Sequence, residues 1–400
     1  MKAIAIFVLF FLTIGCSGKN TIEIVFECSE QLELPYGICS HITRSGQHYD
    51  YDICMDAVSS LTELRIDYIR TAFDCSNITP INKLANTERF DSIFAALSSN
   101  NILVDVLISH LQYDIKCWDD YPSYWRYLDS LVLRYGNKSA CFEMLNEVDR
   151  YSDTDITEQY LKLLKDSYRH IKDINPDIPI LYTGISWSKA GLLYSTMEKG
   201  AFNYFDIMNF HVYDIPENLP SHFYNIKANM IKYGWSKPVW ITECGFSTET
   251  DKEDSKNKEE LQAKFLPRTF LISFAYGIDK VFWYSHRSPE NSISDKEDHY
   301  GIVHRDLSPK PAFYTYKTLI EMCPNGSTRP TLEIEDGLYI SKWTRPDKSN
   351  VMALWSPEGS SNYSLRDFKS PIIYDYMGNK TNISKAVEVS DKIVYVITNH

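Results

Sequence analysis

The chain of 400 residues has few basic side chains for its size: 41 Lys and Arg stand against 53 Asp and Glu, a formal net charge of -12 at pH 7. A protein that binds nucleic-acid phosphates normally has an excess of Lys and Arg, which neutralise those phosphates. The charge balance therefore argues against a nucleic-acid partner. Hydrophobic residues make up 44% and charged residues 24% of the chain, which excludes wholesale disorder.

Several motifs of catalytic and cofactor sites are also missing. The sequence contains no GxGxxG or Walker pattern, no HExxH, no GxSxG and no CxxC. These absences argue against a glycine-rich nucleotide loop, a zinc hydrolase and a serine hydrolase. We therefore expect no cofactor and no catalytic metal.

A long apolar run occurs only at the N-terminus. Lys2 is followed by the apolar stretch 3–14 and then by Gly15-Cys16. This order is typical of a secretory signal, and the run is too short to span a membrane. A Cys directly after Gly15 resembles a bacterial lipoprotein cleavage site. The sequence thus predicts a signal over 1–16, export, and a lipid anchor on Cys16 at the cell envelope, with simple secretion as the alternative.

Eight further cysteines are scattered along the chain. Their even number in an exported protein permits disulfides. However, several fall in or beside predicted strands, where a free Cys behaves as a small buried hydrophobic residue. We expect mostly free thiols.

Eight short apolar runs recur about 29 to 41 residues apart, the length of one strand-plus-helix unit. Helical periodicity fills the intervals between them. This alternation indicates a parallel sheet covered by helices, and eight units fit a (β/α)8 barrel over 34–325. An open doubly wound sheet is the alternative. The predicted strands are 36–42, 68–73, 102–109, 140–146, 178–183, 207–212, 239–243 and 280–285.

The pattern changes beyond residue 325. Short strand-like runs separated by turn residues, with no helical periodicity, predict a small antiparallel β-sandwich over 330–400. Residues 17–33 form a linker, and the strand-like stretch 21–26 within it is a candidate to pair with that sandwich.

Two predicted strands end in a carboxylate. The fourth ends in Glu143-Met144-Leu145-Asn146-Glu147 and the seventh in Trp240-Ile241-Thr242-Glu243. Barrel enzymes place their working residues at the C-terminal ends of strands, so Glu147 and Glu243 should meet at the barrel mouth. Hydrolysis of a glycosidic bond needs two such groups: one protonates the leaving oxygen and the other attacks the anomeric carbon.

The arrangement resembles the retaining glycoside hydrolases of clan A, closest in style to families 39 and 5. In that clan an Asn-Glu pair after strand four supplies the acid/base, here Asn146-Glu147, and a Glu ending strand seven is the nucleophile, here Glu243. The resemblance covers about residues 34–323 and implies a carbohydrate substrate. The substrate-binding candidates at strand ends are Arg70, Asn146, His211, Tyr213 and Trp283, with His41, His110 and Trp187 beside them.

The chemistry of the side chains suggests a role for each stronger candidate. Arg70 and Tyr213 should keep Glu243 ionised, while burial and the second carboxylate should raise the pKa of Glu147 so that it carries a proton. His211 should bind a carboxylate or the sugar, and Trp283 should stack on a sugar ring. The two carboxyl groups should lie about 5–5.5 Å apart, as retention requires.

The predicted function is therefore an exported retaining β-glycosidase that acts on oligo- or polysaccharides. A transglycosylase would use the same residues with a sugar acceptor in place of water. A non-catalytic glycan-binding surface lipoprotein is the alternative from a different class.

Overall fold

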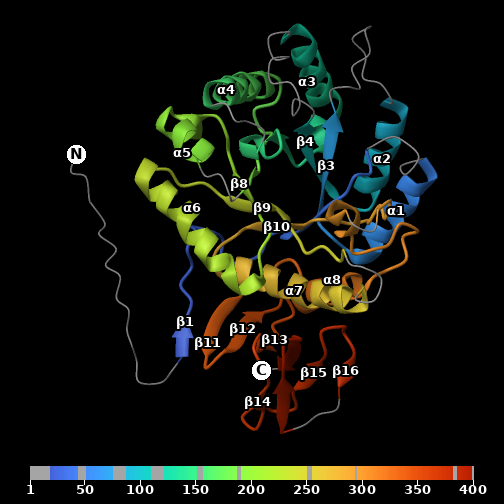
Figure 1. The fold of residues 1–400 in the computed structure, drawn as a ribbon, viewed down its shortest axis with the longest axis vertical. Coiled ribbons are helices and arrows are strands. Elements are labelled where there is room, and N and C mark those ends of the chain that lie inside the picture. The colour runs from blue at the N-terminus through green and yellow to red at the C-terminus, as the bar shows by residue number, and fades with distance from the viewer. Residues whose placement is uncertain are drawn as a thin grey trace.

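The computed structural model describes residues 19–43, 51–74, 87–109, 121–150, 156–186, 191–249, 255–292, 295–381 and 385–398. Its larger part is a parallel barrel surrounded by helices, as the sequence predicted, and a smaller antiparallel sheet lies against one side of it (Figure 1). None of the helices in these ranges combines the length and apolar character needed to cross a membrane.

The barrel has eight strand positions. Seven are single strands, and the fifth is split into two short pieces at the two ends of the hydrogen-bonded order. One piece pairs with β5 and the other with β8, and a bridge between Leu181 and Ile207 completes the circle. The strands are β2 (Tyr36–Cys39), β3 (Tyr68–Asp74), β4 (Leu103–Ser109), β5 (Cys141–Met144), β6 (Ile180–Leu181), β7 (Ile185–Ser186), β8 (Met208–Val212), β9 (Val239–Cys244) and β10 (Lys280–Trp283).

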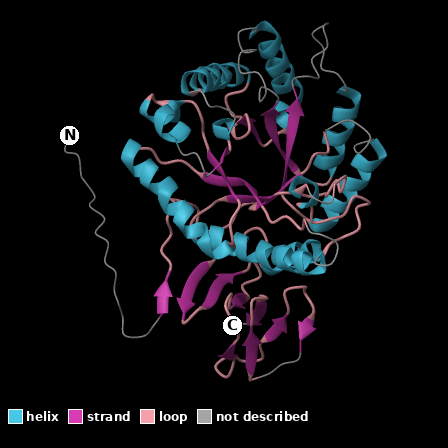
Figure 2. Cartoon of the chain, in the orientation of Figure 1, coloured by secondary structure: helices cyan, strands magenta, loops and turns pink. Residues whose placement is uncertain are grey.

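One helix follows each strand position and covers the outside of the barrel (Figure 2). The helices are amphipathic: in α4, for example, Tyr160, Leu161, Leu164 and Ile171 face the core at helical spacing and are buried. They are α1 (Tyr51–Leu64), α2 (Thr87–Ser99), α3 (Tyr121–Tyr135), α4 (Thr157–Ile174), α5 (Gly191–Glu198), α6 (Leu219–Tyr233), α7 (Ser255–Ala275) and α8 (Pro311–Met322). Short 3-10 turns occur at Gly136–Lys138, Val148–Arg150, Ala201–Asn203, Pro216–Asn218 and Lys296–His299.

Alternate residues of the strands point to different sides. One set, which includes Tyr68, Trp240 and Phe282, packs together inside the barrel. Their neighbours Ile69, Ile241 and Trp283 belong to the layer between strands and helices. Aromatic rings thus fill one part of the barrel interior, and the polar side chains inside the barrel lie toward the C-terminal ends of the strands.

The C-terminal sheet packs beneath α7 and α8 (Figure 1). Its antiparallel order is β1 (Lys19–Thr21), β11 (Thr331–Glu335), β12 (Leu338–Thr344), β13 (Asn350–Trp355), β18 (Val394–Thr398), β15 (Ile372–Tyr374) and β16 (Lys380–Thr381). The pair β14 (Ser361–Ser364) and β17 (Ala386–Val389) covers its outer face. The N-terminal segment joins this sheet through β1, which overlaps the predicted stretch 21–26 only at Thr21.

Among the described residues, Cys28, Cys39, Cys141, Cys244 and Cys323 are free thiols, and all of these except the half-buried Cys28 are buried. Cys54 is also buried. Cys16, Cys75 and Cys117 lie outside those ranges.

Candidate active site

A buried arginine organises the polar end of the bore. Arg70 on β3 donates from Nε and Nη2 to the two oxygens of Glu143, at 2.6 and 2.9 Å. Its Nη1 donates to Glu243 at 2.6 Å and its Nη2 to the side-chain oxygen of Asn146 at 2.7 Å. A guanidinium can serve several acceptors because its donors form a rigid planar fork. Arg70 therefore holds together the ends of β5 and β9.

The chain turns sharply after β5. Leu145 and Glu147 both have positive φ, 66° and 43°, and the backbone N–H of Glu147 donates to the carbonyl of Gly184 at 2.9 Å. Residues other than glycine rarely adopt a positive φ, so the contacts around Leu145 and Glu147 must stabilise this backbone conformation. It leaves the Glu147 carboxyl buried, with Oε1 2.9 Å from Nδ1 of His211 and Oε2 2.5 Å from the Arg150 guanidinium.

A bulge near the end of β9 places the second carboxylate. Phe210 on β8 is opposite Ile241, but the next residue, His211, is opposite Glu243, so Thr242 is the extra residue. The pairing with β10 shifts at the same point. A bulge re-aims side chains that would otherwise alternate. Here both Thr242 and Glu243 contact groups in the bore.

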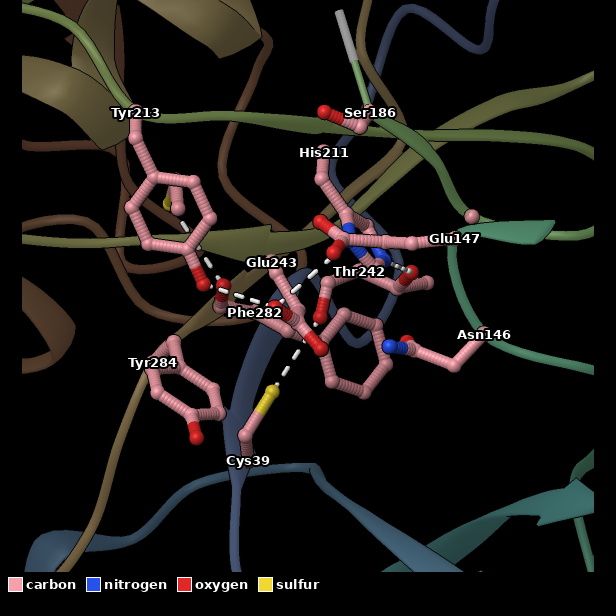
Figure 3. A network of polar contacts seen from close by, with 12 residues as sticks. Cys39, Asn146, Glu147, Ser186, His211, Tyr213, Thr242, Glu243, Phe282 and Tyr284 are labelled. Carbon is pink, nitrogen blue, oxygen red and sulfur yellow. Dashed lines mark hydrogen bonds and ion pairs between the residues drawn. The ribbon is translucent and has the colours of Figure 1, made fainter. Parts of the chain in front are cut away.

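Glu243 is buried and has three polar neighbours. Besides Arg70, the Tyr213 hydroxyl donates to its Oε2 at 2.6 Å, and Nδ1 of His211 lies 3.5 Å from the same oxygen. One oxygen of Glu147, one oxygen of Glu243 and one His211 nitrogen all lie within 4.8 Å of one another. Figure 3 shows the three side chains converging, with Tyr213 directed at Glu243. The two carboxylates predicted from the strand ends therefore meet.

Residues 153–300 match the family described as the glycosyl hydrolase catalytic core. That stretch contains His211, Tyr213 and Glu243 and begins just after Glu147. The chain is a glycoside hydrolase. No curated protein matches the sequence.

Solved structures of similar fold come from several bacteria. A family 39 glycoside hydrolase from Bacteroides cellulosilyticus WH2 is 18% identical with a TM-score of 0.75, covering 93% of this chain and 82% of that one. A family 39 β-xylosidase from Caulobacter crescentus is 12% identical, with a TM-score of 0.65 and coverages of 94% and 98%. A family 30 subfamily 8 xylanase from Clostridium acetobutylicum is 13% identical, with a TM-score of 0.63 and coverages of 93% and 98%. These likenesses agree with the family 39 style of architecture predicted from the sequence.

The charge state of the hydrolase's Glu147 differs from the expectation. Burial alone raises its pKa, but the hydrogen bond with His211 and the ion pair with Arg150 outweigh burial and lower that pKa to about 2. Burial lowers the pKa of His211, but Glu243 and the hydrogen bond to Glu147 more than offset this and raise it above the ordinary 6.5. The expected raised pKa of Glu147 is therefore wrong: the two pKa shifts favour a Glu147 carboxylate beside a protonated His211. The sequence could not show Arg150 folding back on Glu147.

Trp283, which was predicted to stack on a sugar ring, does not reach the mouth of the barrel. Trp283 has only 1% of its surface exposed and lies in the layer between barrel and helices, so this placement contradicts a stacking role. The next residue, Tyr284, is half-buried at the mouth, and its ring makes edge contacts with Tyr213 and Tyr300. Nε2 of His41 lies 3.3 Å from the Tyr284 hydroxyl, so His41 borders the site. Tyr284, which belongs to the aromatic run that ends the eighth predicted strand, and Tyr300, which was given no role, are the candidate sugar contacts at the mouth.

The remaining predicted residues have different outcomes. Asn146 is half-buried beside Glu147 and accepts from Arg70. His110 and Trp187 lie outside the described residues, so their predicted roles stay predictions. Glu143, which the sequence analysis noted without a role, is the fully buried partner of Arg70. Strand position alone could not reveal that pairing.

One group of side chains in the described ranges has the spacing to hold a metal ion, namely Glu147, His211 and Glu243. Each of the two carboxylates is already bound by an arginine, at 2.5 Å from Arg150 and 2.6 Å from Arg70. A divalent cation there would face two guanidinium groups, which favours hydrogen bonding and acid–base work over metal binding.

Proposed function

We propose that the protein is a retaining β-glycosidase that hydrolyses O-glycosidic bonds of oligo- or polysaccharides by double displacement. The observation that carries the proposal is the close approach of two carboxylates with different partners. Glu243 contacts the Arg70 guanidinium and a phenol, whereas Glu147 contacts the Arg150 guanidinium and the His211 imidazole, whose raised pKa favours its protonated form. The first set of partners stabilises an anion, and the second can supply a proton.

The first step forms a glycosyl-enzyme. Glu243 attacks the anomeric carbon, and the bond to the leaving oxygen breaks. Nδ1 of His211, 2.9 Å away, first passes its proton to Glu147. Glu147 then passes this proton to the leaving oxygen, so that the step ends with a Glu147 carboxylate beside a neutral His211. Arg70 and the Tyr213 hydroxyl orient the nucleophile, since each donates to a different oxygen of Glu243.

The second step releases the sugar. Glu147, now a carboxylate, takes a proton from water as the water attacks the anomeric carbon, and the bond to Glu243 breaks. Glu147 then returns the proton to Nδ1 of His211, which restores the resting state. Two inversions give net retention. The separation of no more than 4.8 Å between an oxygen of Glu147 and one of Glu243 supports this course. Inverting enzymes instead separate their carboxyl groups by roughly 6.5–9.5 Å to admit a water.

The assignment is tested with Glu147→Ala and Glu243→Ala, and with Glu333→Ala, a change of the same kind in the C-terminal sheet, as the control. Aryl β-glycosides and β-linked oligosaccharides, β-xylosides among them because of the β-xylosidase from Caulobacter crescentus, form the substrate panel. We expect Glu243→Ala to lose several orders of magnitude on every substrate. Glu147→Ala should keep activity on activated aryl glycosides and gain from added azide.

The products decide between the remaining possibilities. NMR of the first product should show the β-anomer; an α-anomer would refute retention. Transfer of the sugar mainly to a second carbohydrate would make the protein a transglycosylase. Glycan binding that survives in all variants, with no cleavage by wild type, would favour a glycan-binding lipoprotein and refute the hydrolase mechanism.

We also propose export and lipidation at Cys16, which the apolar run 3–14 and the Gly15-Cys16 pair support. Expression of the full chain in a bacterium should place it in the membrane fraction with a lipid-modified N-terminus. Cys16→Ala should abolish the modification. Release of an unlipidated wild-type protein into the medium would instead establish simple secretion.

A further inference from the structure

A chain of buried hydrogen bonds runs behind the active site to His211. Nδ2 of Asn209 donates to the carbonyl of Tyr182 at 3.3 Å, and the Thr242 hydroxyl donates to Oδ1 of Asn209. Nε2 of His211 lies 3.1 Å from that same Thr242 oxygen. Asn209 and Thr242 have no exposed surface and His211 has 1%. Figure 3 shows the His211 ring with Thr242 and Glu147 as its two neighbours.

The direction of each bond follows from what the groups can do. The carbonyl of Tyr182 only accepts, so it fixes the Asn209 amide with its NH2 group toward the carbonyl and its oxygen toward Thr242. That oxygen also only accepts, so the single hydroxyl proton of Thr242 is used there. The Thr242 oxygen can then only accept from His211, which requires a proton on Nε2.

We infer that Thr242 and Asn209 are positioning residues that hold the proton of His211 on Nε2, so that Nδ1 is left to exchange the catalytic proton with Glu147. This rests on the proposed function, because it concerns the proton that Glu147 delivers. With Nε2 always protonated, a neutral His211 turns a bare Nδ1 lone pair toward Glu147. Nδ1 of His211 and Oε1 of Glu147 can then form a hydrogen bond only when one further proton lies between these two atoms.

The backbone supports this arrangement at two places. The bulge in β9 turns Thr242 toward His211 while leaving Glu243 on Arg70. Gly184 leaves room for the imidazole: a Cβ there would lie 2.1 Å from Nε2 of His211. The ring is thus confined between Gly184 and Thr242, which keeps Nδ1 aimed at Glu147.

Other charges also act on the His211–Glu147 pair. The carboxylates favour a proton on the imidazole and the guanidinium groups disfavour it. The groups are Glu147 and Asp149 after β5, Glu243 on β9, Arg70 on β3, and Arg150, which contacts Glu147. None of these contacts is removed by a change at Thr242 or Asn209, so such a change isolates the effect of the Nε2 proton.

The experiment compares Thr242→Val, which has nearly the same shape but accepts no hydrogen bond, with Thr242→Ser, which restores the hydroxyl. Thr315→Val, an equally buried change in α8, is the matched control. The readout is kcat/KM against pH for two aryl glycosides of the sugar that wild type cleaves. One carries a poor leaving group that needs protonation, and the other carries an activated one that does not.

We expect Thr242→Val to move the alkaline limb of the profile to lower pH for the poor leaving group. Neutral His211 can then keep its proton on Nδ1 and bind Glu147 as a carboxylate, which opposes protonation of Glu147. At pH 7 kcat/KM on that substrate should fall about 10- to 100-fold, part of the 10²–10⁴-fold that general acids contribute. The activated substrate should change less than about twofold, and Thr242→Ser should recover the wild-type profile.

Asn209→Leu gives a second test if Thr242→Val does not fold. It frees the Thr242 hydroxyl to donate to Nε2, so the limb should move in the same direction. An unchanged limb, or equal losses on both substrates, would overturn the positioning role while leaving the glycosidase intact. Failure of the proposed function looks different, because Glu243→Ala would then match wild type on both substrates.

Discussion

Replacement of Arg70 by Met should separate the role of this residue in stability from its role in catalysis. Arg70 is 4% exposed, and its guanidinium donates to Glu143, which has no exposed surface, and to Glu243. Removing one partner of a buried ion pair typically costs about 3–5 kcal/mol, because the other charge stays buried without a counterion. Arg70→Met leaves the Glu143 carboxylate in that position.

The cost converts to a shift in melting temperature. The unfolding entropy is about 2.1 cal/mol/K per residue. For a chain of 400 residues, a loss of about 3–5 kcal/mol in stability therefore lowers the melting temperature by roughly 4–6 °C. Glu143→Gln added to Arg70→Met should recover at least half of the loss, since a neutral amide replaces the unpaired charge. The double variant should stay as inactive as Arg70→Met, because Glu243 still lacks its guanidinium.

Calorimetry and kcat/KM on an activated aryl glycoside measure the two effects. A melting temperature within 1 °C of wild type for Arg70→Met would refute the argument that Glu143 depends on this ion pair. Recovery of activity in the double variant would refute the claim that Arg70 acts directly on the nucleophile.

Three further predictions concern the same pocket. Tyr213→Phe removes the 2.6 Å hydrogen bond to Glu243 and should lower kcat/KM about 10- to 100-fold, as expected for a bond of about 1.5–3 kcal/mol to a charged group; an unchanged rate would contradict it. Gly184→Ala should displace His211 and lower kcat/KM at least about tenfold with a poor leaving group; a crystal structure with an unmoved ring would be against this. Because the pKa of Glu147 is lowered to about 2 in the folded protein, its stabilisation is present above about pH 4.5 and lost as pH falls toward 2. Glu147→Gln should weaken the pH dependence of urea unfolding over that window, and parallel curves would disprove the shift.

Much of the barrel could be predicted because its strands are continuous apolar runs with helical stretches between them. The carboxylates at the ends of two such runs had to meet, since parallel strands bring their C-terminal ends to one mouth. That argument needs no side-chain detail, and it located Glu147 and Glu243 correctly at the mouth.

The features that the sequence did not predict correctly depend on the pairing between strands that are distant in the sequence. A shift of one residue reverses the side of the sheet to which a side chain points, which is why Trp283 lies in the core while Tyr284 reaches the mouth. The bulge in β9 is set by its pairing with β8 and β10, so Thr242 carried no local sign of its contact with His211. The fifth strand, predicted as one run over 178–183, is divided into two short pieces.

The pairing of β1 with β11 has a consequence for the order in which the protein is made. Lys19 pairs with Glu335, and the N–H of Ile22 donates to the carbonyl of Leu332 at 2.8 Å. A chain that leaves the ribosome or an export channel N-terminus first cannot satisfy these backbone groups until more than 300 further residues have followed. We expect residues 19–22 of a chain arrested before residue 331 to be open to protease and those of the complete chain to be protected. Residues 19–22 thus leave the ribosome early but are among the last residues to form their backbone hydrogen bonds.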